Sequence, residues 1–246
     1  MRGICISVNS AKNLEEYASR TCSQNGEDGI IEYLLGIIGE GTKYSVEFGF
    51  GNQANTLNLL SNKGWSGALF DSDGTSTVSA FTKYYNREDV YVKTVALTPA
   101  NIMEEFDKAK VPETIDVLSI DVDGMDLHLL RAIECKKIRL LVCEYNASFG
   151  PSISVTVPYS DNFNRHIIHP EYHGASLMAI TKVAKTFDLK LVGCEGCGIN
   201  AFYVNKYLPV KPFWVDEAFR NHSKRAGTWV DQLANLKRLG VKLEEV

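Results

Sequence analysis

The sequence predicts a doubly wound α/β fold with a mostly parallel, seven-stranded sheet, an antiparallel last strand and helices on both faces. Short apolar runs rich in β-branched and aromatic residues alternate with longer segments of helical periodicity, which is typical of a parallel sheet covered on both sides. The last two apolar runs are separated only by residues 195–198, and so short a connection requires a hairpin. The 246 residues, 45% of them hydrophobic, are enough for one large core.

The elements follow in chain order. A parallel pair of strands needs a crossover, and the helical segments between the first five apolar runs provide it. We expect the strands at 44–48, 67–71, 90–95, 115–120 and 138–144, and the antiparallel pair at 189–194 and 199–205. We expect the helices at 27–38, 53–63, 74–84, 99–109 and 125–134.

The later part of the chain contains a lid and a tail. Residues 146–172 contain three prolines and no clear periodicity, as active-site lids often do. Further along, helical patterns occur near 214–222 and 228–239. We therefore predict one domain over 1–206 and a helical extension over 207–246, packed on the same domain or on a partner subunit.

Charge and composition exclude several classes of function. The formal net charge is −4, and acidic and basic residues are mixed along the chain, which leaves no basic stripe for a nucleic-acid backbone. No apolar run is long enough to span a bilayer, and the first residues are too weakly apolar for a secretory signal. The six cysteines have no framework spacing, and Cys194 and Cys197 lack the partners of a zinc site. We expect a cytoplasmic protein that binds neither nucleic acid nor membrane.

A glycine-rich turn after the first strand predicts a nucleotide-like cofactor. The chain continues through Gly49 and Gly51, where the backbone must turn tightly and approach a ligand, although an ordinary strand-to-helix turn would have the same sequence. Glu47 discriminates between cofactors, because its carboxylate would repel a nicotinamide diphosphate and attract the cationic ammonium and sulfonium of S-adenosylmethionine. We assign Glu47, Gly49, Gly51 and Asn55 to cofactor binding.

An acidic residue at the end of the second strand completes this pattern. Asp71 lies twenty residues after Gly51, the spacing at which a carboxylate takes both ribose hydroxyls of a nucleoside. Its alternative role is an ordinary helix N-cap. Ser72 follows it directly, and Ala96 lies in the small and apolar end of the third strand, which would form the floor of an adenine pocket.

Three further polar residues follow the fourth and fifth strands. Asp121 ends the fourth strand, and Glu144 and Asn146 end the fifth. Because these strands are neighbours in this topology, the three side chains could converge on Mg²⁺ or Mn²⁺, as in catechol-type O-methyltransferases. The metal would bind an acceptor hydroxyl and lower its pKa. Alternatively, Asp121 orients the methionine end of the cofactor and no metal binds.

Without a metal, a side chain has to remove the acceptor's proton. His169 and His173 lie at the end of the lid, and histidine titrates near neutral pH. We therefore predict His169 and His173 as candidate catalytic bases beside Asp121. A packed or surface histidine is the alternative for each.

The sequence resembles the FkbM-like branch of the Rossmann-like class I S-adenosylmethionine-dependent methyltransferases over residues 23–205. The matching segments are 23–29, 46–49, 64–67 leading into Asp71, 118–124, 144–147, 158–159, 174–177 and 200–202. The resemblance implies methyl transfer to a sugar or other hydroxyl in glycan, capsule or natural-product biosynthesis. It also implies that Gln24 and Asp28 close over the cofactor or acceptor, and that Glu47 and Gly49 border the methionine moiety.

We therefore expect an S-adenosylmethionine-dependent O-methyltransferase that acts on a small polar, carbohydrate-like or phosphorylated acceptor, as a monomer or homodimer. Two alternatives stay open. One is a nucleoside-binding module without catalysis, since a fold does not dictate a function. The other is a NAD-dependent oxidoreductase.

Overall fold

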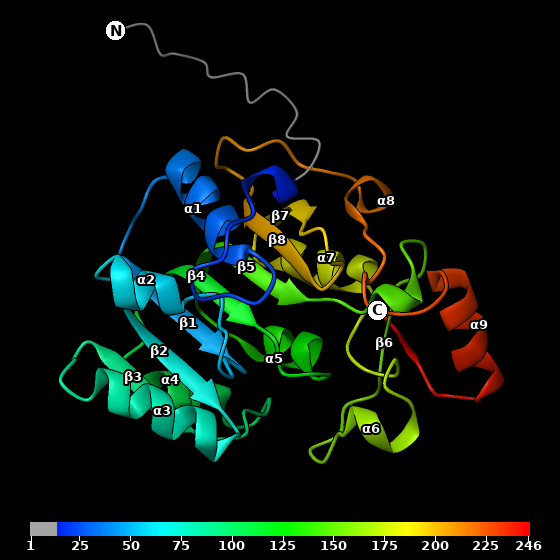
Figure 1. Cartoon of the computed structure of the whole chain (residues 1–246), viewed down its shortest axis with the longest axis horizontal. Coiled ribbons are helices and arrows are strands. Elements are labelled where there is room, and N and C mark those ends of the chain that lie inside the picture. The colour runs from blue at the N-terminus through cyan, green and yellow to red at the C-terminus, as the bar shows by residue number, and fades with distance from the viewer. Residues whose placement is uncertain (1–13) are drawn as a thin grey trace, which may run out of the picture.

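A computed structural model describes residues 14–246 of the chain (Figure 1). Residues 1–13 lie outside the described residues. They include Cys5, the N-terminal segment considered as a secretory signal, and the start of the predicted domain. The main feature is a seven-stranded sheet. Its strands are β1 (Tyr44–Phe48), β2 (Ser66–Asp71), β3 (Val90–Thr94), β4 (Thr114–Ile120), β5 (Lys137–Glu144), β7 (Leu189–Cys194) and β8 (Asn200–Asn205).

The strand order of this sheet is β3-β2-β1-β4-β5-β8-β7. Strands β1 to β5 pair in parallel, whereas β8 runs antiparallel between β5 and β7 and sets Asn200 beside Glu144. The predicted fold class, with its antiparallel last strand, is confirmed. The chain leaves β1 toward β2 and returns at β4, so the order reverses between these neighbours. In open α/β sheets, ligands bind beside the carboxyl ends of the strands at such a reversal.

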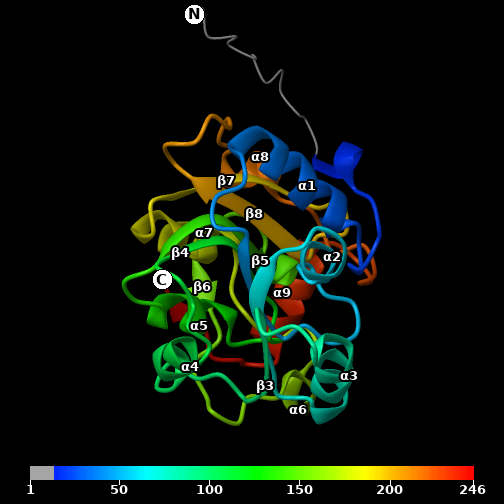
Figure 2. The ribbon, with the colours of Figure 1, turned by 90° about the vertical axis from the view of Figure 1, so that its left-hand side faces the viewer.

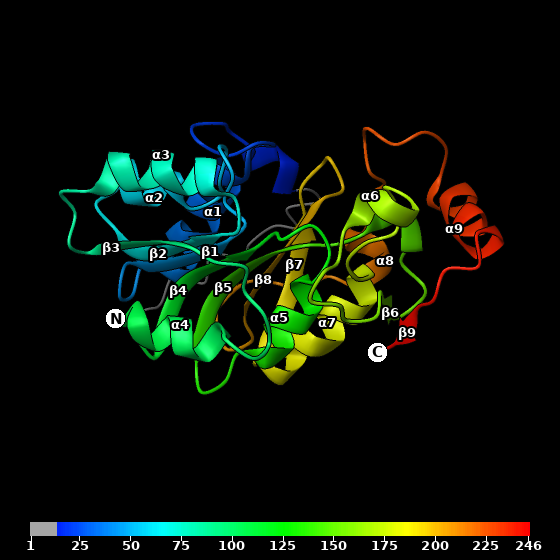
Figure 3. The same ribbon diagram turned by 90° about the horizontal axis from the view of Figure 1, so that it is seen from below.

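Helices cover both faces of the sheet (Figure 3). One face carries α1 (Glu27–Ile38), α2 (Leu57–Asn62) and α3 (Gly74–Tyr84), and the other carries α4 (Ile102–Lys108), α5 (Asp126–Ala132), α7 (Leu177–Thr186) and α8 (Val215–Ala218). In α1, Ile30, Ile31, Leu34 and Ile38 are buried, because their spacing puts them on one stripe facing the sheet. The labels of α1 and α8 both lie near β7 in Figure 2, although the two helices belong to the apolar clusters of opposite faces. No helix of the described chain has the length and apolar character needed to cross a membrane.

Two helices differ from the expectation. Helix α2 begins at Leu57 rather than near residue 53, because the preceding residues form a loop fixed by the carboxylate of Glu47. Helix α7 lies in a segment that the sequence analysis left unassigned. It is short, and Ser176 caps its N-terminus by accepting a hydrogen bond from the backbone of Ala179.

The lid and the tail pack against each other. The lid segment contains the 3₁₀ turn η2 (Ala147–Phe149), strand β6 (Val155–Thr156) and α6 (Arg165–Ile168), and the tail contains α9 (Trp229–Arg238) and β9 (Glu244–Glu245). Strand β6 pairs antiparallel with β9. A separate apolar cluster joins Phe149 and Tyr172 to Leu233 and Leu236 of α9. The lid is therefore ordered by residues nearly a hundred positions further along the chain.

Candidate active site

Two adjoining cavities open at the carboxyl edge of the sheet. The β1–β2 cavity, of about 390 Å³, is lined by residues at the ends of β1, β2, β3 and β4. The β4–β5 cavity, of about 500 Å³, is lined by residues including Gln24, Glu144, Arg165 and His222, and by the loop after β1. Both cavities have Gly49, Gly51, Asp121 and Asp123 in their walls, so they adjoin at these residues, and we refer to the two together as the cleft.

Gly49 is required where the loop after β1 crosses the end of β4. Its φ is 71°, and a Cβ atom at this position would lie 1.8 Å from the backbone oxygen of Asp121. Its N–H donates to the carbonyl of Phe70, at 2.9 Å. Only glycine allows this close approach of two strand ends, so the turn predicted from the sequence has a steric reason.

Asp71 lies in the wall of the β1–β2 cavity, as predicted. Its Oδ2 accepts a hydrogen bond from the N–H of Gly51 at 2.8 Å, and its Oδ1 accepts one from the N–H of Asp73, also at 2.8 Å. Each oxygen keeps a further lone pair for a ligand. The helix N-cap role belongs instead to Asp73, whose carboxylate accepts from the backbone of Thr75 and Ser76. Ser72 and Ala96 line the same cavity.

Glu47 and Asn55 lie behind the cavity rather than in its wall. One carboxylate oxygen of Glu47 accepts from the N–H of Asn55 at 2.7 Å, and the other accepts from the N–H and hydroxyl of Thr56. The Asn55 amide donates to the hydroxyl of Ser119. Burial raises the pKa of Glu47 to about 7, although these hydrogen bonds oppose the shift. The sequence predicts that Glu47 faces the cofactor. In the structure its carboxylate instead holds the loop between β1 and α2.

Of the two residues predicted to close over the cofactor or acceptor, Gln24 lies in a cavity wall and Asp28 does not. Gln24 lines the β4–β5 cavity. The Asp28 carboxylate instead accepts three backbone N–H groups, from Thr21, Cys22 and Ser23, at 2.7–2.8 Å. Asp28 therefore fixes the loop that presents Gln24, without lining either cavity itself.

A cluster of carboxylates lies in the β4–β5 cavity. Oxygens of Asp121, Asp123 and Glu144 come within 4.8 Å of one another. Burial raises the pKa of Asp121 well above its ordinary value, and the nearby charges of Asp126 and Asp123 raise it further. Burial also raises the pKa of Glu144, followed by the charge of Asp121. Glu144 is buried, and its Oε2 has no hydrogen-bond partner among the described residues.

Asn146, the third predicted metal ligand, has no free polar atom in this structure. Its Oδ1 accepts from Arg225 at 2.7 Å and from the N–H of Ser148, while its amide donates to the carbonyls of Glu171 and His173. The third member of the cluster with Asp121 and Glu144 is therefore Asp123, and not the Asn146 predicted from the sequence. Asp123 in turn forms an ion pair with Arg165 of α6.

The two predicted histidines lie outside the cavity walls. His173 is fully buried behind Glu144, with its Nδ1 3.8 Å from Glu144 Oε2, and burial lowers its pKa well below the usual value. His169 lies 3.8 Å from Glu171 and close to the side chain of Asn235 in α9. A base needs hydrogen-bond reach to the proton it removes, and neither ring faces the cavities.

Two arginines of this region were missed by the sequence analysis. Arg165 lines the β4–β5 cavity, and Arg225 lies behind it, bonded to the end of β5. Their partners are 42 and 79 positions away in the chain. No local spacing marks such contacts, so no signal in the sequence could have identified them.

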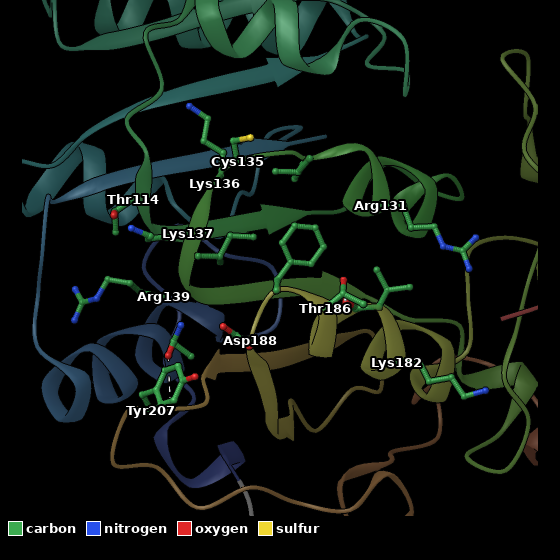
Figure 4. Close-up of a pocket in the computed structure, with 15 residues that line it drawn as sticks. Thr114, Arg131, Cys135, Lys136, Lys137, Arg139, Lys182, Thr186, Asp188 and Tyr207 are labelled. Atoms are coloured by element: carbon green, nitrogen blue, oxygen red, sulfur yellow. Dashed lines mark hydrogen bonds between the residues drawn. The ribbon is translucent and has the colours of Figure 1, made fainter.

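A larger cavity than the β1–β2 and β4–β5 cavities lies at the opposite edge of the sheet (Figure 4). It measures about 930 Å³ and has Lys136, Lys137 and Arg139 in its wall. Lys137 pairs with Glu113 at 2.7 Å, Arg139 pairs with Asp116 at 2.6 Å, and Lys136 donates to a backbone carbonyl. None of the predicted site residues lies there.

Comparisons with known proteins identify the family. The sequence matches the methyltransferase FkbM domain over residues 28–172, more than half of the chain. Similar solved structures include an O-methyltransferase from Bacillus cereus in complex with SAH, at 14% identity and a TM-score of 0.46, covering 80% of this chain and 91% of that one. They also include the N-terminal domain of EvdMO1 in the presence of SAH and D-fucose, at 12% identity and a TM-score of 0.46, covering 77% of this chain and 85% of that one. No curated protein matches.

The family match bears on the alternatives left open by the sequence. A methyltransferase domain excludes the NAD-dependent oxidoreductase, since the two activities use different cofactors. The chain belongs to the FkbM family of S-adenosylmethionine-dependent methyltransferases.

Proposed function

We propose that the protein transfers the methyl group of S-adenosylmethionine to oxygen of a small polar, carbohydrate-like or phosphorylated acceptor, in glycan, capsule or natural-product biosynthesis. The proposal rests on the close neighbourhood of the two cavities, which adjoin at Gly49, Gly51, Asp121 and Asp123. Methyl transfer requires cofactor and acceptor to be held side by side. A cofactor in one cavity and an acceptor in the other would meet at these four residues.

The β1–β2 cavity fits the nucleoside part of the cofactor. Asp71 retains one lone pair on each oxygen, which suits two adjacent ribose hydroxyls. Ala96 and Leu97 offer an apolar wall for the adenine ring. When bound, S-adenosylmethionine supplies the electrophilic methyl group. The chain's own contribution is to bind and orient it.

The β4–β5 cavity fits a polar acceptor. Glu144 and Asp121 have raised pKa values, and a raised pKa makes the ionised carboxylate a stronger base toward a hydroxyl proton. We assign the base to Glu144 rather than to His169 or His173, because Glu144 lines the cavity. Arg165 and Lys224 lie in the same wall, and cations there favour an acceptor with a phosphate or another anionic group.

A divalent metal ion is a second proposal for this cavity. Asp121, Asp123 and Glu144 together offer the oxygen ligands that Mg²⁺ and Mn²⁺ prefer. The ion pair with Arg165 involves Asp123 alone, and the buried Oε2 of Glu144 lacks a hydrogen-bond partner among residues 14–246. A bound metal would lower the pKa of the acceptor hydroxyl.

The experiment measures release of S-adenosylhomocysteine with a panel of monosaccharides and sugar phosphates, in EDTA and with added Mg²⁺ or Mn²⁺. We expect turnover only with hydroxyl acceptors, and a methyl ether in the NMR spectrum of the product. A methylated nitrogen or carbon in the product would reject oxygen transfer. Equal rates in EDTA and in metal would reject the metal site. Glu113→Gln, at the opposite edge of the sheet, is the matched control for Glu144→Gln.

A further inference from the structure

Arg225 connects the tail to the end of β5. It lies in the segment between α8 and α9, partly buried. Its Nη1 donates to Oδ1 of Asn146 at 2.7 Å and to the hydroxyl of Ser148 at 2.6 Å, and its Nη2 lies 2.7 Å from Nε2 of His173. One guanidinium group from the tail thereby holds both the residues that follow β5 and the loop that precedes α7.

This contact determines which nitrogen of His173 carries the proton. A guanidinium group can only donate hydrogen bonds, so Nε2 of His173 must accept. In a neutral imidazole the other nitrogen then carries the hydrogen. Nδ1 of His173 lies 3.8 Å from Oε2 of Glu144, and neither atom has a hydrogen-bond partner elsewhere among the described residues. The Nδ1–H group therefore lies beside the Glu144 carboxylate, at a distance somewhat longer than a hydrogen bond.

We propose that Arg225 is a positioning residue that fixes the Nδ1–H tautomer of His173, and that this N–H orients the Glu144 carboxylate toward the β4–β5 cavity. The inference deepens the proposed function, on which the role of Glu144 rests. It also makes the tail part of the catalytic unit, because no residue between positions 14 and 206 donates to Nε2 of His173. Glu144 is the group that meets the acceptor, and Arg225 acts on it through His173.

The tautomer can be measured without any acceptor or cofactor. In protein labelled with ¹⁵N-histidine, the shifts of the two ring nitrogens distinguish the Nδ1–H form from the Nε2–H form, and loss of a signal in His173→Gln assigns the resonance. We expect Nδ1–H in the wild-type protein. In Arg225→Ala, we expect a shift toward Nε2–H, and millimolar guanidinium should restore the original spectrum. An Nε2–H signal in the wild-type protein would overturn the proposal.

Two further variants separate positioning from folding. Arg238→Ala removes an exposed arginine of α9 and should leave the His173 spectrum unchanged. Arg225→Lys keeps the charge and a donating nitrogen, so it should keep the Nδ1–H form of the wild-type protein, and this comparison does not require Arg225→Ala to fold. A folded Arg225→Ala protein with the wild-type tautomer would contradict the inference. If all of these spectra are as expected but the wild-type protein transfers no methyl group, the result would instead count against the proposed function.

Discussion

The two halves of the cleft differ in how their carboxylates are satisfied. In the β1–β2 cavity, both oxygens of Asp71 accept main-chain N–H groups, and behind the wall Glu47 accepts three donors. In the β4–β5 cavity, Glu144 keeps a buried oxygen with no hydrogen-bond partner among the described residues, close to Asp121 and Asp123. Buried polar groups are usually hydrogen-bonded, and an unmet one has a free-energy cost. The carboxylates of the first half are thus satisfied by the protein itself, whereas in the second half one buried carboxylate oxygen has no donor among residues 14–246.

We expect the largest effect from a substitution of Gly49, which lies in the wall of both cavities. In Gly49→Ala, the new Cβ would overlap the backbone of Asp121 in an unfavourable φ region, so we expect a loss of about 3–5 kcal/mol in the free energy of unfolding. Binding of S-adenosylhomocysteine should be lost with it. Gly51→Ala is the control, because a Cβ there meets nothing within 4 Å and only the φ of 49° is unfavourable. Urea denaturation and calorimetry measure both variants, and equal stability of the two would refute the steric argument.

The pH dependence of stability tests the hydrogen-bonded carboxylate of Glu47, behind the β1–β2 cavity. Its pKa of about 7 in the folded protein lies above the ordinary value of 4.5, so the folded state binds the proton more tightly. The contribution of Glu47 to stability is therefore present below pH 4.5 and is lost as pH rises to 7, by on the order of 3 kcal/mol. Denaturation at pH 5 and pH 8 should reveal a loss of stability that is smaller in Glu47→Gln than in the wild-type protein, because Asp121 and Glu144 also have raised pKa values and remain in the variant. Parallel pH curves would show that Glu47 is ionised throughout.

Asp71 tests cofactor binding alone. Removing the carboxylate in Asp71→Ala deletes two charge-assisted hydrogen bonds to the ribose, and we expect the affinity for S-adenosylhomocysteine to fall by about 100-fold. Isothermal titration calorimetry measures the affinity, with Asp188→Asn as a control at the opposite edge. Unchanged affinity in a folded Asp71→Ala protein would reject the ribose assignment.

A substitution of Glu144 tests the β4–β5 cavity, where a buried carboxylate oxygen has no hydrogen-bond partner among the described residues. Glu144→Gln should change the affinity for S-adenosylhomocysteine by less than about threefold, because the nucleoside cavity does not include this residue. It should also lower the pKa of Asp121, since the charge of Glu144 is removed from a cluster of like charges. ¹³C NMR of labelled aspartate carboxyls measures that shift. Loss of cofactor affinity as large as in Asp71→Ala would remove the distinction between the two halves.

The smallest effect is expected at His169. This ring contacts Glu171 and Asn235 and faces neither cavity, so His169→Ala should change cofactor affinity and methyl transfer by less than about threefold. Steady-state kinetics with any acceptor found in the panel measure the rate. A loss of tenfold or more would return His169 to the catalytic site.

The sequence predicted what depends on local order. Strand β1 has the predicted bounds, because the alternating apolar residues Tyr44, Val46 and Phe48 end at the turn that begins with Gly49. Asp71 and Gly49 line the β1–β2 cavity, and the sequence indicated both because they have fixed spacings around one strand-to-helix turn. The two-residue strands β6 and β9 carry no such pattern, since their pairing depends on the tail returning to the lid.

The candidate site was predicted only in part, for a related reason. Asn146 has the residue type of a metal ligand, but its side chain is occupied by Arg225 from 79 positions away. Glu47 has the charge that suits a cationic cofactor, but its oxygens are occupied by Asn55 and Thr56. Residue type indicates what a side chain can bind. Which partner reaches it first is decided by tertiary packing.

The antiparallel insertion of β8 has a consequence for redesign. Because β8 begins beside the end of β5, the turn between β7 and β8 lies at the ligand-binding edge, and Ile199 from this turn already forms part of the β4–β5 cavity. A hairpin turn can be lengthened without rerouting any helical crossover. Grafting longer loops at residues 196–198 would thus alter substrate preference while the scaffold and the cofactor half remain intact.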